Sequence, residues 1–172
     1  NEESNSLPEV EEFAEAVAPS LVGFDVSVEP GRYISARAGL LVSRVLYRQE
    51  QDGRRIAIVD ASMVELMRPA LYDAHPECIQ VNVKEVEEEE DIQTCDVVGP
   101  GCETTDVLSL ANLQSSAIKP GCLVAFCTSG AYCSTMGGNY NARLRPPELL
   151  VKADGKEIVV ARKRETFESL VR

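Results

Sequence analysis

The chain has 172 residues, which is enough for one domain with a core of its own. Its hydrophobic content of 44% and charged content of 26% are those of a globular protein rather than a disordered one. The formal net charge of −11 argues against nucleic acid and against an anionic membrane surface as partners. The apolar runs are too short to span a bilayer, and the first residues are not a signal peptide. We therefore expect a cytoplasmic location, with a plastid or another organelle as the alternative, and we expect the chain to be a fragment.

Cysteine and histidine usage argues against a metal site. The cysteines are Cys78, Cys95, Cys102, Cys122, Cys127 and Cys133. No two of them form a C-x-x-C pair, so we expect reduced thiols and no structural zinc. The single histidine, His75, precedes Pro76 in a polar turn, where we predict a surface position.

The first thirty residues predict a helix followed by a strand. The segment Ser6–Glu9 has a capping-box pattern, and the apolar spacing from Val10 to Val17 is typical of an amphipathic helix that Pro19 ends. The next segment, Phe24–Glu29, alternates apolar and polar residues with period two, which predicts a strand. Its last residue, Glu29, is then a carboxylate at the carboxyl end of a strand, where α/β barrels place catalytic groups.

Most of the remaining chain predicts short strands separated by turns, the pattern of an all-β sandwich or barrel. The expected strands are Leu40–Tyr47, Ile56–Val59, Cys78–Val83, Leu123–Cys127, Leu149–Lys152 and Ile158–Ala161. Asp52-Gly53 and Asp154-Gly155 are hairpin signals. Short helical segments are expected at Tyr33–Ala38 and at Glu165–Val171. A third short helix is expected after a second capping box at Ser62–Glu65, and we predict that Pro69 ends it. The acidic run Lys84–Asp91 favours a solvated loop, with a partner-binding acidic segment as the alternative.

One turn carries a thiol beside a carboxylate. Asp96–Val98 predicts a short strand, and Gly99-Pro100-Gly101 predicts a sharp bend directly before Cys102 and Glu103. Functional side chains are often displayed at such a strand end. Taken alone, the same pattern also suits a buried structural cysteine beside a solvated glutamate.

Four stretches together carry a family likeness. They are Glu29-Pro-Gly-Arg32, Arg68-Pro-Ala-Leu-Tyr72, Gly99-Pro-Gly-Cys-Glu103, and Gly130-Ala-Tyr132 with Asn139-Tyr-Asn141. In order and spacing, from about Phe24 to Leu170, the chain resembles the C-terminal half of diaminopimelate decarboxylases. These are pyridoxal-phosphate enzymes of the alanine-racemase-like fold, also called fold type III, to which ornithine decarboxylase belongs as well.

The resemblance implies a mainly β fold. Residues 1–32 would be the last helix and strand of a mostly absent (β/α)8 barrel, and residues 33–172 would be the C-terminal β-domain, a β-sandwich or Greek-key barrel. In the family, the barrel holds pyridoxal 5′-phosphate on a Schiff-base lysine. No lysine precedes Lys84 in this chain, which agrees with that lysine lying elsewhere, and we expect the chain alone to be inactive.

The resemblance also implies roles for individual residues. Glu29 would pair with the ring nitrogen of the cofactor, while Gly31 and Tyr132 would contact its phosphate side. Arg32, Arg68 and Tyr72 would grip the far carboxylate of the substrate, and Glu103 would accept its distal ammonium. Cys102 would return a proton to Cα, and Asn139, Tyr140 and Asn141 would be structural. In the family, the cysteine and glutamate of one subunit complete the site of its partner, which implies a head-to-tail homodimer.

The implied reaction is decarboxylation of meso-2,6-diaminopimelate to L-lysine, the last step of lysine biosynthesis. An alternative within the enzyme class is a decarboxylase for ornithine, arginine or another basic amino acid. A non-catalytic homologue that binds a protein partner is a second alternative, and a free-standing β-domain used as a binding module is a third. The implied catalytic positions within the chain are intact, which counts against a non-catalytic homologue.

Overall fold

The computed structural model describes residues 9–81, 94–114 and 118–171. The chain divides into two compact units, Asn1–Pro30 and Gly31–Arg172. The acidic run 84–91 and the predicted Ser6 cap lie outside the described residues. Assignment of the first segment to a barrel stays a prediction.

The first unit contains the predicted helix, with a different start. Helix α1 spans Val10–Val17 and is followed by a 3-10 turn, η1, at Ala18–Leu21, which contains Pro19. The N-cap is Glu9, whose backbone N–H donates to Glu12 Oε2 at 3.3 Å. The Glu9 side chain in turn accepts the Glu12 main-chain N–H, which completes a capping box. Glu9 thus satisfies a free N–H at the start of the helix, as the predicted serine cap would.

The prediction of a strand at Phe24–Glu29 is wrong. The segment carries no strand pairing, and Phe24, Val26 and Val28 are all exposed. A strand exists only through ladder hydrogen bonds to a neighbour, and no segment of the described chain pairs with this one. Its period-two alternation is therefore not enough to form a strand by itself.

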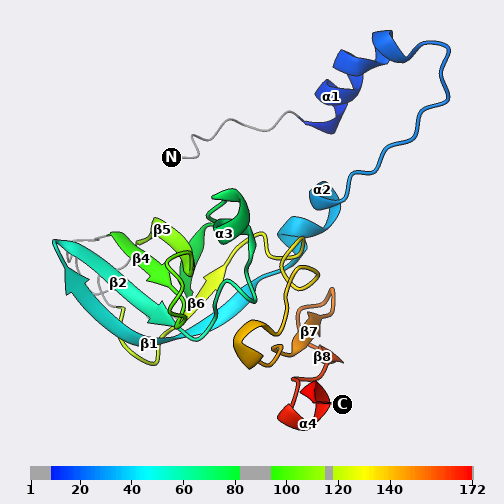
Figure 1. Ribbon diagram of the computed structural model, residues 1–172. Helices are drawn as coiled ribbons and strands as arrows, with labels where there is room; N and C mark the ends of the chain where they lie inside the picture. The colour runs from blue at the N-terminus through cyan, green and yellow to red at the C-terminus, as the bar shows by residue number, and fades with distance from the viewer. Residues whose placement is uncertain (1–8, 82–93, 115–117, 172) are drawn as a thin grey trace. The chain divides into compact units, whose positions relative to one another are not determined.

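The second unit is built on a six-stranded sheet in the order β3-β6-β1-β2-β4-β5 (Figure 1). The strands are β1 (Leu41–Gln51), β2 (Arg54–Val59), β3 (Cys78–Val81), β4 (Thr94–Val98), β5 (Val107–Gln114) and β6 (Leu123–Phe126). Neighbouring strands are antiparallel except β2 and β4, which run parallel. The predicted β-rich fold is confirmed, with a longer strand at β1 than the sequence patterns indicated and a strand, β5, that they did not predict.

The hairpin between β1 and β2 forms at the predicted Asp52-Gly53 turn. Both residues have positive φ, +53° and +76°, as a type I′ turn requires. Gln51 pairs with Arg54 across the turn, and a register shift between Tyr47 and Val45 then places Val45 opposite Val59, both of them buried in the core.

The sheet curls so that its two edge strands, β3 and β5, contact each other. Ser109 on β5 donates its hydroxyl hydrogen to the Pro76 carbonyl oxygen at 3.1 Å and holds this edge closed. The curl encloses one apolar cluster, to which every strand of the sheet contributes. Its most completely buried members are Val45, Ala57, Val59, Val97, Leu108, Leu113, Val124 and Phe126.

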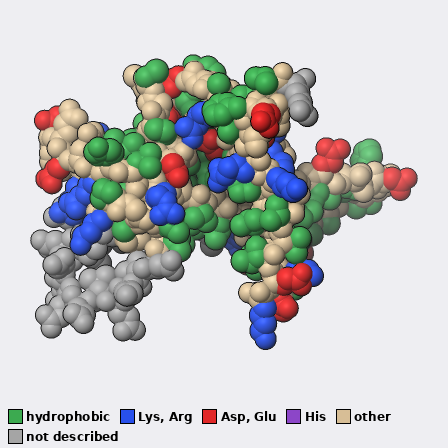
Figure 2. All heavy atoms as spheres, turned by 90° about the horizontal axis from the view of Figure 1, so that it is seen from below, with side chains coloured by type: hydrophobic (Ala, Val, Ile, Leu, Met, Phe, Trp, Pro, Cys, Tyr) green, Lys and Arg blue, Asp and Glu red, His purple; other side chains and the backbone are tan. Residues whose placement is uncertain are grey.

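A separate hairpin and three short helices complete the unit. Strands β7 (Glu148–Val151) and β8 (Ile158–Arg162) form the predicted hairpin, and helix α4 spans Phe167–Leu170. Leu149, Leu150 and Ile158 of the hairpin are exposed. Figure 2 shows hydrophobic side chains reaching the surface between Lys and Arg side chains.

Helix α2 (Arg32–Ser35) and the 3-10 turn η2 (Ala36–Ala38) confirm the predicted helical segment. The prediction that Pro69 cuts a helix is wrong, because Pro69 lies in the first turn of helix α3 (Arg68–Tyr72). At that position proline removes an N–H that has no partner within the helix in any case. The capping-box residues Ser62–Glu65 form a turn before this helix instead of starting one.

Candidate functional site

Cys102 and Glu103 lie on the connection between β4 and β5, as the glycine-rich bend predicted. The Cys102 side chain is exposed, whereas that of Glu103 is partly buried. The interpretation of Cys102 as a buried structural cysteine is thereby excluded. This connection presents a thiol and a carboxylate side by side at the end of a buried strand.

A buried carboxylate holds this connection in shape. Asp106 is 3% exposed, and its Oδ2 accepts the Gly101 N–H at 2.8 Å while its main-chain oxygen accepts the Gly99 N–H at 2.8 Å. A β-carbon on Gly101 would lie 2.5 Å from Glu103 Oε2 and 2.6 Å from Asp106 Oδ2, so a side chain there would displace both carboxylates. Asp106 was not among the predicted site residues, although an acidic residue directly before an apolar strand is a signal that could have indicated it.

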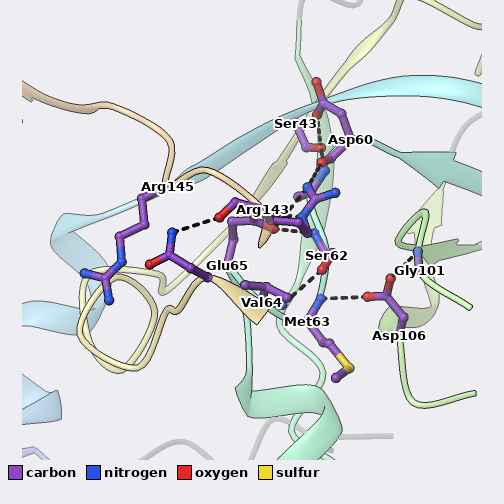
Figure 3. Close-up of polar contacts among 12 residues, drawn as sticks. Ser43, Asp60, Ser62, Met63, Val64, Glu65, Gly101, Asp106, Arg143 and Arg145 are labelled. Atoms are coloured by element: carbon purple, nitrogen blue, oxygen red, sulfur yellow. Dashed lines mark hydrogen bonds and ion pairs between the residues drawn. The ribbon is translucent and has the colours of Figure 1, made fainter. Parts of the chain in front are cut away.

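Asp106 also ties the connection to the turn before α3. Its Oδ1 accepts the Met63 N–H at 2.6 Å, and Figure 3 shows Asp106 between Met63 and Gly101. Helix α3 begins five residues after Met63 and contacts strand β5. One carboxylate thus joins the turn that carries Cys102 to the turn that leads into the candidate substrate-binding helix.

Helix α3 carries Arg68 and Tyr72 on one face, because residues four apart are neighbours on a helix surface. Tyr72 is 63% exposed, and Arg68 is partly buried. A guanidinium and a phenol that share one helix face suit recognition of a carboxylate.

An ion pair fixes the turn before α3 to a distant loop. Arg143 contacts both carboxylate oxygens of Glu65, at 3.3 and 3.4 Å, and donates to the Asp60 main-chain oxygen at 2.6 Å (Figure 3). The Glu65 side chain is only 9% exposed, so the pair is partly buried. Asp60 in turn accepts a hydrogen bond from the Ser43 hydroxyl at 2.6 Å, which anchors the network to β1.

The loop that Arg143 anchors reaches Glu103. Asn141 Nδ2 donates to Glu103 Oε1 at 3.0 Å. Hydrogen bonds from the Glu103 main-chain N–H, from Asn141 and from Tyr140 hold the pKa of the Glu103 carboxyl below its ordinary value. The nearby Glu103 carboxylate raises the pKa of the Tyr140 hydroxyl. Asn139 holds its own turn as predicted, because its Nδ2 donates to the Arg143 carbonyl oxygen at 2.8 Å. The same prediction for Asn141 is incomplete, because Asn141 also contacts Glu103.

The candidate cofactor residues of the second unit form another group. Gly130 N–H donates to the Ala36 carbonyl oxygen at 3.0 Å, and Ser129 N–H donates to the Gly39 carbonyl oxygen at 2.9 Å. A β-carbon on Gly130 would lie 2.9 Å from the Gly39 nitrogen and closer still to the Ser35 carbonyl oxygen, so glycine permits this approach. The contact brings the helical segment that begins at Arg32 against the loop that carries Tyr132.

Tyr132 and Gly31 both have unusual backbone conformations. Tyr132 has φ +58° and is 46% exposed, and Gly31 has φ +26°. A non-glycine residue in the left-handed region costs free energy and often marks a functional turn. Arg32 is exposed at the start of α2, and Glu29 is exposed in the first unit. The role of Glu29 stays a prediction.

His75 lies beside an exposed loop residue, Asp73, as a surface position implies, but its own side chain is only 16% exposed and is therefore largely covered. Its Nε2 lies 3.1 Å from Asp73 Oδ1, while Nδ1 is buried with no hydrogen-bond partner. Asp73 adopts the left-handed conformation at the end of α3 and turns the chain there, and the His75 ring contacts the Asp73 carboxylate two residues back.

All six cysteines are free. Burial raises the pKa of the Cys78 thiol to about 12 and that of Cys133 to about 11, which keeps both protonated near neutrality. Across residues 9–81, 94–114 and 118–171, no three His, Cys, Asp or Glu side chains gather to hold a metal ion. Nor does that part of the chain contain a helix long and apolar enough to cross a bilayer.

The sheet fold and the residues gathered around Cys102 and Arg68 define a class of protein. Residues 32–130 match the family model of the pyridoxal-dependent decarboxylases, C-terminal sheet domain, and the chain belongs to this family. It is 39% identical to diaminopimelate decarboxylase of Haemophilus influenzae over 166 residues, 95% of this chain and 38% of that protein. Identity to the Helicobacter pylori enzyme of the same name is 38% over the whole chain and 41% of the relative.

Solved structures of diaminopimelate decarboxylases have the same fold over nearly the whole of this chain. The diaminopimelate decarboxylase of Helicobacter pylori complexed with L-lysine matches with a TM-score of 0.81 at 35% identity, covering 98% of this chain and 40% of that one. The diaminopimelate decarboxylase of M. jannaschii matches with a TM-score of 0.84 at 29% identity, covering 98% of this chain and 38% of that one. The chain thus spans about two fifths of the length of these relatives.

Proposed function

We propose that this chain is the sheet domain of a decarboxylase that uses pyridoxal 5′-phosphate to convert meso-2,6-diaminopimelate into L-lysine. The observation that carries the proposal is the paired thiol and carboxylate of Cys102 and Glu103 on a turn anchored by Asp106. Support comes from relatives at 37–40% identity that bear the name diaminopimelate decarboxylase. A lysine/ornithine decarboxylase from Vibrio vulnificus is only 23% identical to the chain and supports the fold alone.

Charge complementarity favours diaminopimelate over ornithine. The far end of diaminopimelate carries an ammonium and a carboxylate, whereas that of ornithine carries only an ammonium. In the proposal Glu103 binds the ammonium, and Arg68 with Tyr72 and Arg32 binds the carboxylate. A guanidinium can hold a carboxylate through two parallel hydrogen bonds, so Arg68 is the main determinant of this preference.

The donor set fits a phosphate-bearing cofactor. Gly31 offers main-chain atoms without a side chain at a turn of positive φ, and the contact between Gly39 and Gly130 brings the Tyr132 loop to the same helical segment. Gly31 and Tyr132 would hold the phosphate side, and Glu29 would pair with the ring nitrogen. When bound, the cofactor would supply an electron sink for the pair left at Cα once the bond to the departing carboxyl group breaks.

The chain's own residues then orient the substrate and supply a proton. Arg68, Tyr72 and Glu103 hold the far end, which places Cα within reach of Cys102. After the bond between Cα and the carboxyl group breaks and carbon dioxide leaves, the Cys102 thiol would donate its proton to Cα, and solvent would then protonate the thiolate again. Cys102 acts as a general acid here and forms no bond to carbon.

The proposed assembly is a head-to-tail homodimer. Cys102 and Glu103 of one subunit would complete the site that contains Arg68 and Tyr72 of its partner. The exposure of Cys102 and Tyr72 supports this arrangement, because both side chains are available to a second copy. A cytoplasmic location would keep the Cys102 thiol reduced.

The test measures carbon dioxide release by the purified intact protein with pyridoxal phosphate on diaminopimelate, ornithine and arginine. We expect release from diaminopimelate at a kcat/KM at least a hundredfold above the other two. Equal rates on ornithine or arginine would overturn the substrate assignment. Absence of release from all three would favour a non-catalytic, partner-binding homologue.

A further inference from the structure

Two loops far apart in the sequence meet at Glu103. Asn141 lies 38 residues from Glu103, yet its Nδ2 donates to Glu103 Oε1 at 3.0 Å. The Tyr140 hydroxyl and the Cys102 thiol lie close enough to this carboxylate to help lower its pKa. The carboxylate assigned to substrate recognition therefore has protein partners before any substrate arrives.

The loop that carries Asn141 is rigidly placed. Asn139 Nδ2 donates to Glu165 Oε2 at 2.6 Å, and Arg143 binds Glu65 and the main chain of Asp60. Each contact joins the loop to a different part of the second unit. Asn141 is thus held from both sides and cannot easily follow a carboxylate that moves.

The backbone at Asn141 suits its side-chain contact. Asn141 has φ +56° and ψ +30°, a left-handed conformation that asparagine tolerates better than most residues. This conformation, which costs free energy in most residues, is retained at the position that contacts Glu103. The neighbouring Ala142 has φ +55° without a polar side chain, so the backbone shape alone does not require an amide.

The Glu103 loop is equally well placed. Asp106 N–H donates to the Glu103 carbonyl oxygen at 3.0 Å, and the Asp106 carboxylate holds Gly101 on the other side. Only the side-chain torsions of Glu103 then remain to be set. A flexible glutamate would lose side-chain entropy on binding an ammonium, and a partner that fixes it beforehand removes part of that cost.

We propose that Asn141 is a positioning residue for Glu103: its amide fixes the carboxylate in the orientation that receives the distal ammonium of the substrate. This inference rests on the proposed function of Glu103. An ammonium has three N–H donors and no acceptor, so it can satisfy the Glu103 lone pairs that Asn141 leaves open. Asn141 acts through Glu103 and needs no contact with the reacting atoms.

The test compares two matched variants of the intact protein, Asn141→Gly and Ala142→Gly. Glycine keeps the positive φ at either position, so Asn141→Gly removes the amide without imposing backbone strain. We expect Asn141→Gly to raise KM for diaminopimelate about tenfold, the effect of losing one charge-assisted hydrogen bond, with little change in kcat. Ala142→Gly should leave both parameters unchanged.

A double-mutant cycle with Glu103→Gln separates this inference from the proposed function. If Asn141 acts through Glu103, the double variant should be no worse than Glu103→Gln alone. An Asn141→Gly protein with normal KM, beside a Glu103→Gln protein with raised KM, would overturn the positioning role and leave the proposed function standing. Full additivity of the two KM effects would also overturn the positioning role.

A spectroscopic readout does not depend on turnover. The Glu103 carboxyl carbon, followed by NMR across pH, should titrate at a higher pH in Asn141→Gly because a hydrogen bond to the charged form is lost. Cys102 and Tyr140 lie beside this carboxyl, the Asp106 N–H binds the Glu103 carbonyl oxygen, and all three residues are unchanged in both variants. An identical titration in Asn141→Gly and the parent protein would contradict the proposed contact.

Discussion

Asp106 Oδ1 accepts a hydrogen bond from the Met63 N–H at 2.6 Å, although the two residues lie 43 positions apart. The contact joins the turn that carries Cys102 and Glu103 to the turn that precedes α3. Because Asp106 is buried, its acceptor atoms have little access to water that could replace a lost partner. The geometry of the candidate site therefore depends on a residue that we do not expect to touch substrate.

Asp106→Asn should destabilise the fold. The asparagine amide places an NH2 group against one of two main-chain N–H donors, which leaves a buried donor unsatisfied at a cost of about 2 kcal/mol. Thermal unfolding should show a lower Tm, by about 4–8 °C. Asp52→Asn, in the exposed β1–β2 turn, is the matched control and should keep the parent Tm. Equal Tm values for the two variants would contradict the structural role of Asp106.

Arg143→Met should be more damaging than loss of a surface ion pair. It leaves the Glu65 carboxylate, whose side chain is 9% exposed, without its guanidinium partner. Breaking a buried pair costs about 3–5 kcal/mol, and since Arg143 is 30% exposed we expect the lower end of that range. Urea unfolding would measure it, with Lys152→Met as control because Lys152 and Glu157 form an exposed pair at 2.7 Å. A loss no larger than that of the control would refute this expectation.

Alkaline pH should destabilise the protein through Cys78. Burial raises the pKa of this thiol to about 12, above its value in the unfolded chain, so the folded state binds the proton more tightly. The resulting stabilisation is complete below pH about 9 and is lost as pH rises toward 12. Cys78→Ala should flatten this alkaline decline relative to Cys102→Ala, measured by urea unfolding between pH 8 and 11. Parallel curves for the two variants would argue against the Cys78 contribution.

Arg68→Ala should weaken binding of diaminopimelate by the intact protein. Removing the guanidinium from a partly buried carboxylate pair costs about 2–5 kcal/mol, which should appear mainly in KM. Arg164→Ala, at an exposed position outside the candidate site, is the control for loss of one positive charge. Ornithine should lose much less than diaminopimelate, because it has no far carboxylate. Equal losses on both substrates would remove Arg68 from the proposed role.

The 172-residue chain by itself should form no stoichiometric covalent adduct with pyridoxal phosphate. Lys119, Lys152, Lys156 and Lys163 are exposed and lie outside the candidate site. An exposed lysine is mostly protonated near neutrality, with a pKa of about 10.4, and is a poor nucleophile toward an aldehyde. Borohydride reduction followed by peptide mass spectrometry should find only scattered labelling. A single fully labelled lysine would show that this domain carries its own cofactor site.

The sequence by itself determined the features that depend on neighbouring residues. The Asp52-Gly53 pair made the first hairpin predictable, because these residue types tolerate the positive φ that both adopt. Glycines on both sides of Pro100 made the bend before Cys102 predictable. Alternating apolar residues identified most strands of the sheet, because one face of each strand is buried. The four matched stretches likewise identified the family, which residues 32–130 confirm.

Only the tertiary structure decided which distant groups meet. The parallel pairing of β2 with β4 brings the turn at Met63 close to Asp106, and the contacts of Arg143 with Glu65 and Asp60 hold the loop that brings Asn141 to Glu103. No local pattern specifies either contact. The same limit explains the error at Phe24–Glu29 and the partial covering of His75. A strand needs a partner, and burial needs a covering segment, whereas periodicity reports only the preferences of the backbone along one stretch.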